Sequence, residues 1–169
     1  MKKLCLVLLL LFCFGMEHKE ANGEELEKIY LEGGYKQTYE ALKEAEDFFK
    51  LDISLPTRIP SIAFTHNFGR FTTLGNPQLE ITYLNENSGE VHYKILVTSL
   101  KYKQEFTADQ NVQRMKLNDG SEAVYVITEN FDLLVFEKYG LQYTLMVDKI
   151  HLDKFTKEAL SKIANSINK

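Results

Sequence analysis

The stretch LNDGSEAVYVITENFDLLVFEKYGLQYTLMV, residues 117–147, decides the fold class. Short turn signals at 118–120 and 139–140 interrupt its runs of apolar and β-branched residues. Asp-Gly and Asn-Gly pairs supply the positive φ that tight hairpin turns require. Residues 133–136 are continuously apolar, which is typical of a strand with neighbours on both sides. The pattern predicts two antiparallel hairpins, with strands at 112–117, 121–128, 132–138 and 141–147.

A further hairpin is predicted upstream of this stretch. Residues 78–84 place Leu79, Ile81 and Tyr83 on one face, because successive side chains of a strand alternate. The turn-forming cluster NENSG follows, and 90–99 is again rich in β-branched and aromatic residues. The connection from 102 to 113 is polar and has no clear period. Residues 51–55 also alternate, which predicts a half-buried strand that ends at Pro56.

Amphipathic helices flank these strands. A short helical segment, 24–31, stops at Gly33-Gly34, since glycine is costly inside a helix. A second helix begins at Thr38, which we expect to be its N-cap, and buries Leu42, Ala45, Phe48 and Phe49. The last helix is capped by Asp153 or Thr156. Its apolar stripe has helical spacing and consists of Leu160, Ile163, Ala164 and Ile167.

These elements predict an α+β fold. We expect a single twisted antiparallel sheet of about six to seven strands, packed against an N-terminal and a C-terminal helix. No internal repeat or low-complexity segment divides the chain. The domain organisation is therefore a leader at 1–23 and a single α+β domain at 24–169.

The leader has the order of a secretory signal peptide. Lys2 and Lys3 precede an apolar run from 4 to 16, and small residues follow at Ala21-Asn22-Gly23. The run is shorter than the roughly 20 residues that a membrane-spanning helix needs. We expect cleavage after Gly23 and a protein that is secreted or lies on the extracytoplasmic face of the cell envelope. Lipidation of Cys13 is the alternative, and only then do we expect membrane association; bulky Phe12 in front of it argues against a lipobox.

Charge and cysteine content limit the partners. The predicted mature chain keeps 17 basic and 22 acidic residues, a net charge of −5, and has no basic cluster. This argues against nucleic acid and anionic lipid surfaces as partners. Both cysteines lie in the leader, and 146 residues suffice for a core without disulfides. We expect a monomer.

The order of motifs resembles a family of uncharacterised extracytoplasmic domains. The residues that carry it are EAEDFF before LDISLPTRIPSI, then ITYL, NDGSEAVYV, LLVFEKYGLQYTLMV and KEALSKIANSI, which together cover about 40–168. Members occur in Gram-positive exported lipoproteins, sporulation proteins and anti-sigma-factor-like regulators, as domains of unknown function. Two departures are Phe136, where many members have Trp, and Ser61-Ile62-Ala63 after the second proline. The resemblance implies the fold and an extracytoplasmic location, and no catalytic residues.

No catalytic or metal-binding motif is present. A G-x-S-x-G elbow and an H-E-x-x-H zinc motif are absent, and His66, His92 and His151 fall in separate segments. The turn at 85–90 lacks the acidic ladder of a calcium loop. We therefore expect no enzyme, no cofactor and no metal.

One segment is a weak candidate for ligand binding. Three aromatic side chains, a histidine and an arginine lie close together between the prolines and the first hairpin. Such residues are common at recognition surfaces, although a strand with its aromatics in the core explains them as well. The candidate residues are Phe64, His66, Phe68, Arg70 and Phe71.

Three functional hypotheses follow. The first is a non-enzymatic exported domain that binds an envelope protein or regulates one. The second is a carrier that holds a lipid or other apolar ligand between the sheet and its helices, and the third is an unrecognised hydrolase. The expected lining of the carrier cavity is Phe106, Val124, Val126, Leu134, Phe136, Tyr143 and Leu145.

Overall fold

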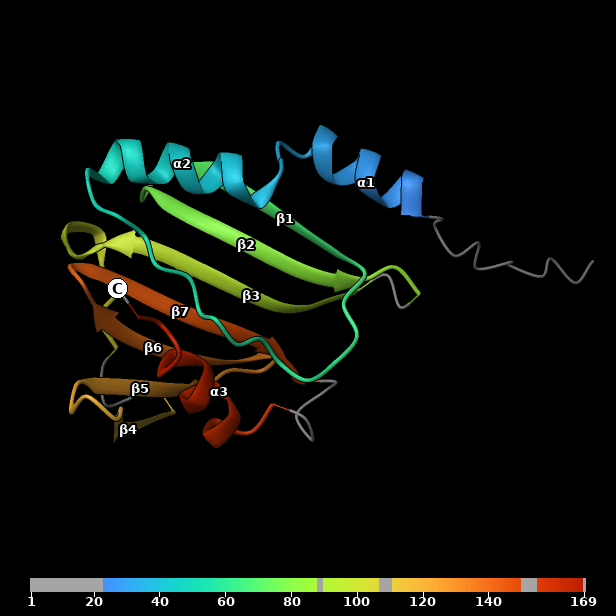
Figure 1. Cartoon of the computed structure of the whole chain (residues 1–169). Coiled ribbons are helices and arrows are strands. Elements are labelled where there is room, and N and C mark those ends of the chain that lie inside the picture. The colour runs from blue at the N-terminus through green and yellow to red at the C-terminus, as the bar shows by residue number, and fades with distance from the viewer. Residues whose placement is uncertain (1–22, 88–89, 107–110, 150–154, 169) are drawn as a thin grey trace, which may run out of the picture.

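The computed structural model describes residues 23–87, 90–106, 111–149 and 155–168. They form one open antiparallel sheet of seven strands and three α-helices, which confirms the α+β class (Figure 1). The strand order is β1-β2-β3-β7-β6-β5-β4, so the strand predicted at 141–147 lies in the middle. The strands are β1 (His66–Thr72), β2 (Gln78–Asn85), β3 (Glu90–Ser99), β4 (Val112–Lys116), β5 (Glu122–Ile127), β6 (Phe131–Lys138) and β7 (Leu141–Asp148).

The helices are α1 (Gly23–Glu32), α2 (Thr38–Phe49) and α3 (Lys157–Ala164), and a single 3₁₀ turn, η1 (Leu100–Tyr102), follows β3. The predicted hairpins therefore lie where the turn signals place them. The connection after β3 crosses over the sheet to reach β4 at the far edge, because β3 and β4 are separated by three strands. The leader expected at 1–23 lies outside the described residues except for Gly23, the first residue of α1.

The sheet has two faces that the pairing register defines. Ile81 pairs with Ile95, Ile95 with Leu145, and Leu145 with Leu134. We call their face the inner face, and the face of Glu80 and Thr144 the outer face. The inner face, α2 and α3 share one core, whose fully buried members include Tyr93, Tyr143, Phe136, Phe155 and Leu160.

Helix α2 contacts the inner face of β1 very closely. A Cβ added to Gly69 would lie 2.7 Å from Ala41 Cβ and 2.9 Å from Thr38 Cα, so a glycine is required there. The prediction that Thr38 is the N-cap of α2 was wrong. Gln37 holds the N-cap position, and its side chain makes no capping hydrogen bond. The Thr38 hydroxyl instead donates to Asn67 Oδ1 at 2.8 Å, because β1 lies within its reach.

The apolar stripe of α2 contains three of its four predicted residues and Ala41 in addition. Ala41 and Ala45 are buried, and Leu42 and Phe49 are partly buried against the core. Phe48 is 46% exposed and was wrongly assigned to the buried stripe. Its ring contacts Phe71 at the sheet edge instead, with 5.3 Å between the centroids.

The strand predicted at 51–55 was also wrong. Lys50 ends α2 in the left-handed conformation, and the chain then runs over the inner face without joining the sheet. The N–H of Ile53 donates to the Glu46 carboxylate at 2.9 Å, so a side-chain oxygen accepts the hydrogen bond that a neighbouring strand would otherwise accept. Ile53 is nevertheless buried, with Leu51 and Leu55 partly buried against the core. The alternation at 51–55 therefore predicted correctly which side chains are buried, but it wrongly predicted that the segment pairs with a strand.

Helix α3 begins as expected at one of the two predicted caps. The Thr156 hydroxyl accepts a hydrogen bond from the N–H of Ala159 at 3.2 Å; Asp153, the other candidate, lies outside the described residues. The stripe of Leu160, Ile163, Ala164 and Ile167 is buried in the shared core.

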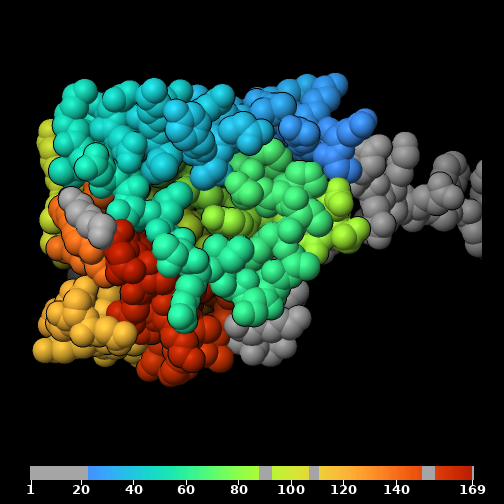
Figure 2. All heavy atoms as spheres, viewed as in Figure 1, coloured from blue at the N-terminus to red at the C-terminus, as the bar shows by residue number. Residues whose placement is uncertain are grey.

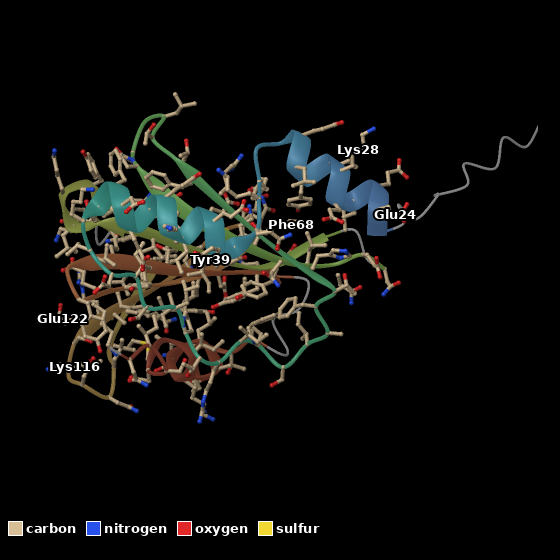
Figure 3. The ribbon with its side chains drawn as sticks, turned by 45° about the horizontal axis from the view of Figure 1, so that its top comes forward. Glu24, Lys28, Tyr39, Phe68, Lys116 and Glu122 are labelled. Carbon is tan, nitrogen blue, oxygen red and sulfur yellow. The ribbon has the colours of Figure 1, made fainter. Side chains whose placement is uncertain are left out.

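Helix α1 belongs to a second, smaller cluster. Leu26 packs with Phe68 and Leu84, which lie on the outer face, and Tyr30 stacks on Phe68 with 4.8 Å between the ring centroids. Figure 3 shows Phe68 beside α1. The chain between α1 and α2 then passes along the β1 edge, where Lys36 forms a bridge with Gly69.

Candidate functional site: a polar groove along α3

The five candidate residues of the first hairpin region do not form one site. Phe68 and Arg70 alternate with Gly69 and face outward with His66, whose ring stacks on Phe68 at 5.9 Å. Phe71 lies on the opposite face. Phe64 precedes β1 and packs in the core region, with its ring centroid 5.3 Å from that of Tyr83. Two faces of the sheet therefore separate them.

Arg70 is part of a closed polar cluster around Glu80. Its Nη2 donates to Glu80 Oε2 at 2.9 Å, while Lys94 Nζ and the Tyr35 hydroxyl donate to Oε1 at 2.5 and 2.8 Å. Burial alone would raise the pKa of Glu80, but the hydrogen bond and charge of Lys94, with the bonds from Tyr35 and Arg70, lower that pKa to about 2. The carboxylate is saturated, so this cluster ties three strands together and leaves little for a ligand.

A groove follows α3 on the face of the molecule that Figure 2 shows. Two neighbouring pockets of about 600 and 290 Å³ share Arg58, Glu158 and Lys162 in their walls and together follow α3. Figure 2 shows α3 and the segment 55–60 side by side on this face. We call the two pockets together the α3 groove. The larger pocket is also lined by the polar residues Asn118, Ser161, Asn165, Ser166 and Asn168.

The proline-bounded segment is fastened to α3 by backbone contacts. The Thr57 hydroxyl donates to the Ser166 carbonyl at 3.2 Å, and the N–H of Arg58 donates to Ser166 Oγ at 3.2 Å. Ser166 Oγ in turn donates to the Ile163 carbonyl at 2.6 Å. Since Pro56 and Pro60 stiffen the segment on both sides, the groove wall that carries Arg58 is held in place.

The other wall comes from the turn between β4 and β5. The N–H of Asn118 donates to Asn165 Oδ1 at 2.8 Å, which joins the turn to the end of α3. Asn165 Nδ2 lies 3.4 Å from Ser161 Oγ, and Asn168 Nδ2 lies 3.4 Å from the Ser166 carbonyl. The groove is thus bordered by amide and hydroxyl groups on both sides.

Two positive charges in the α3 groove form no ion pair with any described residue, although Glu158 lies in the same walls. Within the part of the chain that the structure describes, neither Arg58 nor Lys162 has a carboxylate within salt-bridge distance, although eight other ion pairs are formed there. Both side chains are exposed. The arrangement of free cations among amides favours a ligand with negative charge and hydrogen-bonding groups.

The lining expected for an apolar carrier is divided between the two faces. Leu134, Phe136, Tyr143 and Leu145 are buried in the inner-face core, where they contact other side chains. Val124 and Val126 lie on the outer face, since they alternate with Ala123 and Tyr125 of the core. Phe106, Val124 and Phe136 border a third pocket, of about 470 Å³, which opens toward the outer face. The other four residues of the expected lining do not border it, so the seven do not surround one common space.

A buried ionisable pair lies near the start of α3 and carries no sequence signal. The Tyr125 hydroxyl donates to Asp132 Oδ2, and Lys149 Nζ lies 3.9 Å from Asp132 Oδ1. Burial, followed by the bond to Asp132, raises the pKa of Tyr125. Asp132 is only 4% exposed, and its hydrogen bond with Tyr125 joins β6 to β5 inside the fold, so we assign the pair a structural role.

The described residues do not bring metal-binding side chains together in a cluster. Among the described residues, no group of three or more His, Cys, Asp and Glu side chains is placed to hold a metal ion. His66 bonds the neighbouring Thr65 hydroxyl at 2.9 Å, and His151 lies outside the described residues. In the described ranges, each helix is too short or too polar to cross a membrane.

Sequence reasoning missed the α3 groove because its residues come from three segments. Asn118 was placed in a predicted turn, and neither Arg58 nor Lys162 was named as a candidate. The available signal was an arginine between two prolines, which fixes the backbone around an exposed cation.

Comparison with known proteins finds no relative that would assign this groove. No family model matches the chain. No curated protein and no solved structure matches it either.

Proposed function

We propose that this protein is an exported, non-enzymatic domain of the cell envelope that binds a hydroxyl-rich, negatively charged ligand in the α3 groove. A carboxylated or phosphorylated sugar chain has this chemistry. The observation that carries the proposal is the pair of exposed cations, Arg58 and Lys162, that form no ion pair with the described residues and lie in a groove bordered by amides.

The groups of the groove match such a ligand one by one. A guanidinium binds a carboxylate or phosphate through two parallel hydrogen bonds, so Arg58 would orient the acidic group. Amide side chains both donate and accept, and Asn118, Asn165 and Asn168 would therefore bind ligand hydroxyls. Glu158 would accept a hydrogen bond from a ligand hydroxyl. The shared wall of the two pockets suits an extended chain more than a compact ion.

Location and assembly complete the proposal. The leader directs the chain out of the cytoplasm, where glycans that carry carboxylates and phosphates are exposed to it. The resemblance to extracytoplasmic domains supports the same compartment. We propose that the mature protein acts as a monomer without cofactor, bound to the membrane only if Cys13 is lipidated.

The test uses a defined probe. Oligogalacturonate and the neutral maltotriose should be titrated against the mature chain by isothermal calorimetry. We expect binding of the acidic oligosaccharide, and a loss of about tenfold in affinity for Arg58→Gln or Lys162→Gln, because each removes one charge-assisted contact. The matched control is Lys43→Gln, which removes an exposed charge from α2. Equal affinity in all variants, or no binding of any anionic sugar, contradicts the proposal.

The carrier hypothesis remains a proposal with its own readout. Native mass spectrometry of freshly purified protein detects a co-purified lipid directly. A bound lipid would favour the carrier over the glycan-binding domain, and a clean mass of the apo chain would count against it.

A further inference from the structure

The two edges of the sheet are treated differently. At the β1 edge, Lys36 and Gly69 exchange both backbone hydrogen bonds, at 2.8 and 2.9 Å, so the chain itself covers part of the edge. At the other edge, β4 pairs only with β5, and among the described residues no backbone group bonds to its outward side. An uncovered edge strand is a template for another extended chain.

The register identifies which backbone groups are free. In antiparallel pairs, residues that exchange hydrogen bonds alternate with residues that do not. The N–H of Leu117 bonds to Ser121 at 2.9 Å, and that of Ile127 to Asn111 at 3.0 Å, so the odd positions of β4 bond to β5. The N–H and C=O groups of Val112, Arg114 and Lys116 therefore point away from the sheet.

The side chains of the same residues lie on the outer face. Arg114 is opposite Val124, and Val124 is opposite Val135, which continues the outer row across the sheet. The pocket of about 470 Å³ is bordered by Arg114, Val124, Val135 and Phe106, so it lies next to the free edge. Its carboxylates are Glu105, Glu122 and Glu137. Lys103 forms ion pairs with Glu105 and Glu137, and Glu122 lies opposite Lys116, so Arg114 is the cation of this pocket without a facing carboxylate among the described residues. Arg114 has no ion-pair partner among the described residues. Figure 3 shows Lys116 and Glu122, one on each strand, at this edge.

We propose that the β4 edge docks an extended acidic peptide, which adds to the sheet as an eighth strand with a carboxylate opposite Arg114. Main-chain bonds to Val112, Arg114 and Lys116 supply affinity, and the adjoining pocket selects the side chains that face it. In an antiparallel addition, Arg114 at the centre of the strand selects one acidic residue, since Lys116 already lies opposite Glu122 of β5, and an apolar residue lies beside Val112.

A second copy of this chain fits the edge poorly. An antiparallel β4–β4 pair centred on the strand would place Arg114 opposite Arg114, and like charges directly opposite each other are destabilising. The peptide site is separate from the α3 groove, which adjoins the inner-face side of β4 through Met115. Each site is therefore tested without the other.

The experiment uses the mature chain and a labelled synthetic peptide, Thr-Thr-Thr-Glu-Thr-Val-Thr, in fluorescence anisotropy. We expect binding that weakens by about tenfold for Arg114→Glu and recovers when the peptide glutamate is replaced by lysine, since the charge pair is then reversed. N-methylation of the peptide amides that face β4 should abolish binding, whereas methylation of the alternate amides should not.

Two results would overturn the proposal. If both methylated peptides bind equally, the backbone edge is not used, and any binding is only electrostatic. If Arg114→Glu binds the acidic peptide as well as the unchanged protein does, Arg114 does not read the charge. Because the variants change exposed side chains of a short edge strand, circular dichroism should verify that they fold.

Discussion

The backbone N–H of Arg58 donates to the side-chain oxygen of Ser166, at 3.2 Å, and so joins the proline-bounded segment to the end of α3. Two segments more than a hundred residues apart thereby form one wall of the α3 groove. This contact makes the position of Arg58 a property of the folded core and not of a free loop. The groove is preorganised, which reduces the entropy that a ligand would lose on binding.

Ser166→Ala tests this relationship. The change removes the acceptor for Arg58 and the donor to the Ile163 carbonyl, so we expect about 1 kcal/mol of destabilisation in urea unfolding and weaker binding of oligogalacturonate. Ser61→Ala, an exposed hydroxyl of the same segment, is the control. An affinity unchanged in Ser166→Ala would show that the contact does not position Arg58.

Glu80→Gln tests the closed cluster on the outer face. Removing the charge leaves Lys94 and Arg70 without their partner, and we expect a loss of about 3 kcal/mol at pH 7. The pKa of Glu80 is about 2 in the fold against its ordinary value of 4.5, so the stabilisation is complete above pH 4.5 and is lost as the pH falls toward 2.

The measurement for this prediction is the free energy of unfolding in urea between pH 3 and 8. The difference between the wild type and Glu80→Gln should shrink on the acid side. Glu44→Gln, which removes an exposed pair with Lys36, should change stability by less than about 0.5 kcal/mol. A difference that stays constant with pH would contradict the lowered pKa.

Gly69→Ala tests the contact between α2 and β1. A methyl group would lie 2.7 Å from Ala41 Cβ, and α2 or β1 must move to make room. We expect about 1–3 kcal/mol of destabilisation in urea. A neutral result would mean that the helix packs less closely on the strand than described.

Leu160→Ala tests the docking of α3, because Leu160 is fully buried. The expected loss is about 2–5 kcal/mol by urea unfolding. Leu74→Ala is the matched control: Leu74 is 88% exposed, and its truncation should leave stability nearly unchanged. A small effect at Leu160 would show that α3 contributes little to the core.

The sequence predicted the sheet better than the site, for physical reasons. Turn residues such as Asp119-Gly120 act locally, so the hairpins could be located from short windows. Residues 51–55 alternate because one side is buried against the sheet, and alternation alone does not report pairing. The crossover from β3 to β4 depends on contacts distant in sequence, and so does the meeting of Arg58 with Asn165 in the α3 groove.

The central claim is that the α3 groove binds an acidic, hydroxyl-rich ligand. The most direct measurement is an NMR titration of the ¹⁵N-labelled mature chain with trigalacturonate. The account predicts saturable shifts concentrated at Arg58, Asn118, Lys162 and Asn165, with none at the Glu80 cluster. Shifts that gather elsewhere on the sheet, or an unchanged spectrum at saturating ligand, would contradict it.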